Sequence, residues 1–179
     1  MSQLLDQPPP DDEVTTGVVC IGSKIFLFER EDDRGNGFSS PRSVTFWDVP
    51  TDCKSSSGGA AASTLALKAA DLCLFVFDRS DHQTWIEVTQ AWQELRLRCQ
   101  DDNSDLPRVL LVGNFADVGT KCVFDKEVER FVKKRKGVEY VEASARTGDG
   151  VLQVERKVLE MLLGGDGEAV VVEQTKMVR

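Results

Sequence analysis

Two continuous apolar runs constrain the fold of this chain more than any other feature. They lie at residues 72–77 and 109–112 and show no polar alternation. Such runs suit strands that are buried on both faces of a parallel sheet. Between them, apolar residues recur every three or four positions, which predicts a helix with one buried face: Trp85, Val88, Trp92, Leu95 and Cys99. A strand, a crossover helix and a second strand indicate an α/β protein.

The rest of the chain continues the same alternation of strands and helices. The pattern predicts strands at 18–28, 43–47 and 138–141, helices at about 60–70, 125–136 and 151–163, and a loose polar connection at 29–42. Ser80, with Gln83 three residues on, predicts a capping box at the start of the first crossover helix. The predicted architecture is a doubly wound, mostly parallel sheet.

The composition predicts three segments. Residues 1–14 are rich in Pro and Asp, which is typical of a flexible lead-in. Residues 15–163 carry the predicted elements and form one predicted domain. Residues 164–179 form a tail that follows a glycine-rich break, and its apolar patch at 169–172 predicts an extra strand.

Charge and cysteine content narrow the partners and the compartment. The net charge of −8 argues against a nucleic-acid-binding protein, which needs a basic face. The five cysteines are odd in number and lack CxxC spacing, which together with the absence of a signal peptide predicts reduced thiols and a cytoplasmic protein. No apolar segment approaches the length of a membrane span. The last five residues contain no cysteine for a prenyl anchor, so any membrane contact is expected to be indirect.

Three predicted strand ends carry polar residues. Asp48 follows the strand at 43–47, Asn114 and Asp117 follow the strand at 109–112, and residues 144–148 follow the strand at 138–141. Ligands of open α/β sheets bind at the carboxyl ends of the strands. These three ends are therefore the candidate site.

The segments around these strand ends resemble the motifs of small GTPases of the Ras superfamily, closest to the Rab branch. Residues 71–85 resemble "DAVILVYDVTDRESF", residues 111–117 resemble "LVGNKxD", residues 144–150 resemble "SAKTGEGV", and residues 46–48 resemble the start of "WDTAGQE". The match extends from about Thr15 to Leu163, and its specificity lies in the order of the four motifs. The resemblance implies a small GTPase-like α/β fold.

The resemblance also implies guanine-binding residues. A carboxylate accepts hydrogen bonds from both N1–H and the 2-amino group of guanine, a donor pair that adenine lacks. Asp117 matches this carboxylate, and Asn114 matches the residue that braces the loop and reaches the base edge. The backbone N–H of Ala145 would hold the 6-oxo group. Ser144 and Arg146 complete the set, with Arg146 at the position of a family lysine.

Plainer roles stay open for the same residues. In the plainer interpretation, Asp117 only caps the loop before a helix and Asn114 is only a turn residue. For Ser144, a role as a turn hydroxyl is as well supported as a role as a ligand. Phe115 stands where the family has a lysine whose stem covers the base and sugar; it can stack on a base but lacks the lysine's polar contacts.

The phosphate-binding half of the family pattern is missing. The string GxxxxGK[ST] occurs nowhere in the 179 residues. Thr51 replaces the glycine that senses the γ-phosphate, and Asp52 replaces the glutamine that orients water. Asp48, and less clearly Thr15, match the residues that support Mg²⁺ in the family. We therefore expect negligible GTP hydrolysis and weak or absent binding of GTP or GDP with Mg²⁺.

The missing loop also takes away the first strand of the family, which lies between the strands that match 43–47 and 72–77. An empty slot leaves backbone groups unpaired. Three solutions are open. A partner protein supplies a strand, the chain is a splice product or incomplete gene model of a longer GTPase, or residues 169–172 fill the slot beside residues 44–47.

These observations predict a Rab-like pseudo-GTPase. The family resemblance implies that it is a protein-interaction module of vesicle or intraflagellar trafficking, which binds an effector or a trafficking-complex subunit. The alternative is a genuine GTP-binding and GTP-hydrolysing Rab-type switch, present here as a truncated isoform or gene model.

Overall fold

The computed structural model describes residues 20–31, 37–48, 69–101, 105–163, 168–170 and 175–177. The predicted lead-in at 1–14 lies outside these residues, as does the predicted helix at 60–70 apart from residues 69 and 70. The chain divides into two compact units, one made of residues 1–69 and 164–179 and the other of residues 70–163. Each unit has its own sheet.

The first unit contains an antiparallel sheet centred on β1 (Cys20–Glu31). On one side β1 pairs with β2 (Gly37–Asp48), from Cys20 opposite Asp48 to Glu31 opposite Gly37. On the other side it pairs with two short strands of the tail, β6 (Glu168–Val170) and β7 (Thr175–Met177). The predicted loose connection at 29–42 is therefore strand at both of its ends.

The tail does not take the place predicted for it. Val170 lies opposite Leu27 and Ala169 opposite Phe28, so β6 pairs with β1 and not with residues 44–47 of β2. The prediction that residues 169–172 lie beside residues 44–47 is wrong. The physical reason is that β2 leaves the other edge of β1 unpaired, and the returning tail satisfies those backbone groups by antiparallel pairing.

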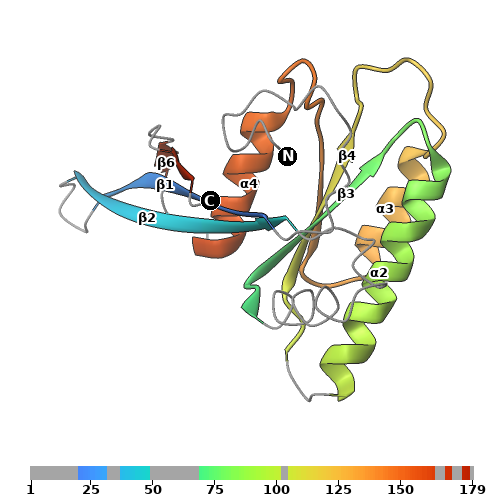
Figure 1. The fold of residues 1–179 in the computed structure, drawn as a ribbon, viewed down its shortest axis with the longest axis horizontal. Coiled ribbons are helices and arrows are strands. Elements are labelled where there is room, and N and C mark those ends of the chain that lie inside the picture. Colours follow the sequence, from blue (N-terminus) through green and yellow to red (C-terminus); the bar gives the residue numbers. More distant parts are fainter. Residues whose placement is uncertain are drawn as a thin grey trace. The chain divides into compact units, whose positions relative to one another are not determined.

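The second unit contains a parallel sheet of β3 (Leu72–Asp78), β4 (Arg108–Asn114) and β5 (Val138–Glu142), in that order. The helices are α2 (His82–Asp101), α3 (Asp125–Lys133) and α4 (Val151–Leu163). In Figure 1, α2 and α3 cover one face of this sheet and α4 covers the other. The predicted α/β, doubly wound architecture is confirmed. Within the described residues, β3 pairs with β4 alone.

The core of this unit follows the apolar pattern of the sequence. Val109, Leu110 and Leu111 of β4 are fully buried because helices cover both faces of the central strand. On the side of α2, four aromatic rings pack together: the ring centroids of Phe77 and Trp85 are 5.0 Å apart, those of Trp85 and Phe131 5.3 Å, and those of Trp92 and Phe131 6.1 Å. These aromatic residues are core residues.

The capping prediction for α2 is wrong by one residue. Asp81 is the cap, because its carboxylate accepts the backbone N–H of Gln83 at 2.8 Å. Ser80 has another partner: its hydroxyl and its N–H both donate to the carboxylate of Asp78 at 2.6 Å. The helix predicted at 125–136 is shorter than expected and ends at Lys133.

Candidate functional site

The candidate site is built from two loops at the carboxyl ends of neighbouring strands. One loop follows β4 and the other follows β5, and the last pair of the ladder joins Gly113 and Glu142. Beyond it, the N–H of Ala143 donates to the carbonyl of Gly113 at 2.9 Å, and the N–H of Ala116 donates to the carbonyl of Ala143 at 3.2 Å. Backbone hydrogen bonds therefore extend the strand pairing into the loops and hold them together.

Asn114 braces the second loop. Its side-chain oxygen accepts the backbone N–H of Ala145 at 3.0 Å. Its carbonyl accepts the N–H of Arg79, at the end of β3, at 3.2 Å. Asn114 therefore connects the ends of three segments.

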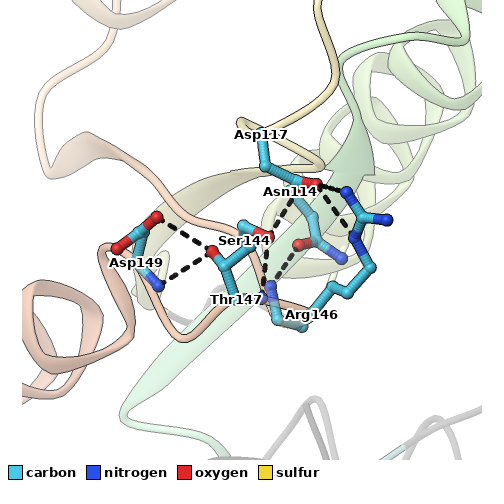
Figure 2. A network of polar contacts seen from close by, with 7 residues as sticks. Asn114, Asp117, Ser144, Arg146, Thr147 and Asp149 are labelled. Carbon is cyan, nitrogen blue, oxygen red and sulfur yellow. Dashed lines mark hydrogen bonds and ion pairs between the residues drawn. The ribbon is translucent and has the colours of Figure 1, made fainter.

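Asp117 is the centre of the polar network in Figure 2. One carboxylate oxygen accepts the hydroxyl of Ser144 at 2.5 Å. The other accepts Nε of Arg146 at 3.0 Å and also contacts a terminal nitrogen of the same guanidinium. Ser144 is buried, the side chain of Asp117 is 11% exposed and that of Arg146 is 73% exposed. The Ser144 hydroxyl, followed by the Arg146 guanidinium, holds the pKa of Asp117 below its usual value.

The turn after Ser144 fixes the position of its hydroxyl. The N–H of Thr147 donates to the Ser144 hydroxyl oxygen at 3.2 Å, and the Thr147 hydroxyl donates to the Asp149 carboxylate at 3.0 Å. Gly150 ends the turn with φ +75°, and a Cβ there would lie 2.2 Å from the carbonyl oxygen of Glu142. Only glycine fits this position without a shift of the backbone.

Phe115 has a conformation that is rare for a side chain of its size. It follows Asn114 with φ 60°, and the residue is 42% exposed. The loop is held on both sides, by Asn114 and by the hydrogen bond from the N–H of Val118 to the carbonyl of Phe115 at 3.0 Å. These contacts keep the large apolar ring partly in solvent next to the site.

The structure brings together five of the seven predicted site residues: Asn114, Asp117, Ser144, Ala145 and Arg146. The other two residues are the predicted metal-supporting ones. Asp48 ends β2 in the first unit and is exposed, and Thr15 lies outside the described residues, as do Thr51 and Asp52. No cluster of three His, Cys, Asp or Glu side chains that fits a metal ion occurs in the described part of the chain.

Arg79 is a residue that the sequence pattern does not single out. It directly follows β3, is buried, and forms ion pairs with Asp125 of α3 and Glu142 of β5. Its carbonyl accepts the N–H groups of Cys122 and Val123 at 2.8 and 3.1 Å. The available signal is a charge that directly follows an apolar strand, where the motif "YDVTD" has valine. Arg79 therefore holds the end of the loop that joins β4 to α3.

The fold and the site define the class of protein. The parallel sheet with helices on both faces defines a doubly wound α/β protein. A carboxylate, an amide and a hydroxyl lie on the loops at the carboxyl ends of its strands, where proteins of this class bind their ligands.

The comparison with known families names the family. The model of the Ras family matches residues 60–163, more than half of the chain, so the chain belongs to the Ras family. The chain is also similar to the Ras-related protein Rab-27B of Homo sapiens, with 26% identity over 90 residues, which are 50% of this chain and 40% of that protein. The chain thus covers less than half of the length of this curated relative, and the likeness is to the Rab branch.

Membership of the Ras family relates the two loops of the site to the nucleotide-binding loops of that family. Ras-family proteins are small GTPases that in general bind GTP or GDP with Mg²⁺ and interact with protein effectors. The family match includes both loops of the polar network around Asp117. None of the described helices is long and apolar enough to cross a membrane.

Proposed function

We propose that this chain is a Rab-like pseudo-GTPase that acts as a protein-interaction module in intracellular trafficking, of vesicles or of intraflagellar cargo. It works in the cytoplasm and binds an effector or a subunit of a trafficking complex. It contacts membranes only indirectly, through its partners. Guanine nucleotide, with Mg²⁺, binds weakly or not at all.

The observation that carries this proposal is the absence of the string GxxxxGK[ST] from the 179 residues. In the family, this string supplies the N–H groups and the lysine that hold the β- and γ-phosphates. Phosphate contacts provide much of the electrostatic stabilisation in phosphoryl transfer. Without these phosphate contacts, the 179 residues fit a module of constant shape better than a nucleotide-driven switch.

A second candidate function rests on the length of the match. The chain aligns with 40% of Rab-27B, so a genuine GTP-binding and GTP-hydrolysing switch whose sequence is only partly present here is the alternative. The polar network at Asn114, Asp117 and Ser144 is compatible with this alternative.

Titration of the 179-residue chain with a fluorescent GTP analogue, with and without Mg²⁺, tests the proposal. We expect no saturation at micromolar concentrations in either buffer. The matched control is Asp117→Ala, which removes the carboxylate that would accept the guanine donors. Micromolar or tighter binding that requires Mg²⁺ and is lost in Asp117→Ala would establish the alternative.

A further inference from the structure

The side chain of Arg146 lies on the carboxylate that would recognise guanine (Figure 2). We propose that the guanidinium of Arg146 is an internal ligand of the Asp117 carboxylate and occupies the place of the guanine donors. Guanine then binds only when this guanidinium is displaced. The inference deepens the proposed function, on which it rests, because it names a second cause of weak nucleotide binding that is independent of the phosphate loop.

A count of acceptor sites gives the first support. A carboxylate offers about four lone-pair sites. In Asp117 the Ser144 hydroxyl uses one site, and the two guanidinium nitrogens of Arg146 use two sites on the other oxygen. One of the four is left, whereas guanine needs two, for N1–H and the 2-amino group. Guanine and Arg146 therefore compete for Asp117.

The chemistry of the two donors gives the second support. The guanidinium of arginine and the N1–C2–N2 edge of guanine are both planar groups with adjacent N–H donors. The family lysine at this position carries a compact ammonium, which does not reproduce that edge. The change from lysine to Arg146 thus places a mimic of the ligand within reach of the ligand's own acceptor.

Two further polar groups of the site have partners without a ligand. The N–H of Ala145, which would hold the 6-oxo group, donates to Asn114 at 3.0 Å. The Ser144 hydroxyl has both Asp117 and the N–H of Thr147 as partners. A site in which most of these donors and acceptors are already paired gains little from binding a base, because most new hydrogen bonds replace existing ones.

The exposure of Arg146 sets the size of the effect. Its side chain is 73% exposed, so water screens the ion pair and the side chain loses rotational freedom when it is held. Displacement of the guanidinium from Asp117 therefore costs little free energy. Arg146 lowers the affinity for guanine without abolishing it. We expect its removal to tighten binding about fivefold, the upper range for an exposed pair.

The test is an NMR titration of the ¹⁵N-labelled 179-residue chain with GMP, in which the amide of Ala145 is followed. AMP is the control ligand. The variants are Arg146→Ala and Arg146→Gln, of which the second keeps most of the side-chain length. The matched control variant is Arg156→Ala on α4, which removes the same charge from an exposed helical position. GMP and AMP isolate base recognition from the γ-phosphate and from Mg²⁺.

We expect both Arg146 variants to bind GMP about fivefold more tightly than the unmodified chain, with AMP binding unchanged and Arg156→Ala equal to the unmodified chain. The proposal is wrong if either Arg146 variant stays within twofold of the unmodified chain, if GMP does not shift the Ala145 amide in these variants, or if Arg156→Ala tightens binding equally. Failure of the proposed function has a different signature, namely micromolar Mg²⁺-dependent GTP binding by the unmodified chain.

Discussion

At the scale of single residues, Ser144 contributes to the ionisation of Asp117. The hydroxyl is buried and donates to the carboxylate at 2.5 Å, and this hydrogen bond is the main cause of the lowered pKa of Asp117. We predict that Ser144→Ala raises the pKa of Asp117 toward its ordinary value of about 4. A ¹³C-detected NMR titration of the side-chain carboxyl measures it. Thr89→Val on α2 is the control, because the Thr89 hydroxyl donates to the carbonyl of Ile86 and is not part of the network around Asp117.

The lowered pKa of Asp117 also makes the stability of the protein depend on pH. A carboxyl group whose pKa is lower in the folded state stabilises the protein above the unfolded pKa of about 4, and this contribution is lost as the pH falls through the folded pKa. The difference in the free energy of unfolding between the unmodified chain and Ser144→Ala should therefore be larger at pH 6 than at pH 3. A difference that is constant over this range would contradict the role of Ser144.

A second prediction at this scale concerns how Arg79 stabilises the second unit. Its side chain is 1% exposed, whereas its partners Asp125 and Glu142 are 60% and 39% exposed and can be hydrated without it. Arg79→Ala leaves a cavity and should lower the free energy of unfolding by about 3 kcal/mol. Arg79→Met fills most of the volume and should lower it by less than about 1.5 kcal/mol, because the ion pair itself contributes little net stability.

Urea unfolding measures both changes. Fluorescence in a Trp47→Phe background reports on the second unit alone, because Trp85 and Trp92 are then the remaining tryptophans and both are buried in it. If Arg79→Met is as costly as Arg79→Ala, the charge of Arg79 and not its volume is what stabilises the unit.

At the scale of elements, the turn between β5 and α4 depends on two glycines with different surroundings. Gly148 and Gly150 have φ +86° and +75°, but a Cβ at Gly148 meets open space, whereas at Gly150 it meets the Glu142 carbonyl. We predict that Gly148→Ala lowers the free energy of unfolding by about 1 kcal/mol, through backbone conformation alone. Gly150→Ala should cost about 2–4 kcal/mol and displace α4. The same urea assay compares them, and equal losses would mean that the turn shifts freely.

Elements with a strong apolar pattern were predictable from sequence, and their ends were not. Trp85, Val88, Trp92 and Leu95 of the predicted stripe are buried, because 3.6-residue periodicity is a property of the helix itself. Cys99, the last residue of the predicted stripe, is only half-buried. The cap of α2 depends on competition between neighbours. Ser80 is an acceptable cap by type, but Asp78 accepts both of its donors, and Asp81 takes the position.

At the scale of the whole molecule, the family and the α/β class followed from the order of the motifs, and the family model confirms them over residues 60–163. The predicted guanine residues do meet around Asp117, since neighbouring parallel strands end at the same edge. The hydrogen-bond partners of these side chains within the site were not predictable from the sequence. That Arg146 donates to Asp117 depends on a side-chain conformation that no sequence spacing encodes.

The strand with which the tail pairs was also not predictable from the sequence. The apolar residues at 169–172 indicated a strand, but an apolar patch carries no information on which open edge it meets. The structure places β6 on β1, and the choice reflects which backbone groups are left unpaired in the first unit.

The pairing of β6 with β1 has a consequence for how the chain folds. Leu27 and Val170 are 143 positions apart, whereas β1 and β2 are joined by a connection of a few residues. Closing so long a loop is entropically unfavourable until the residues between are compact. During synthesis, the β1–β2 hairpin is complete long before Val170 leaves the ribosome. Until then one edge of β1 stays open to other strands, so this edge is where a nascent chain is most exposed to mispairing and to chaperones.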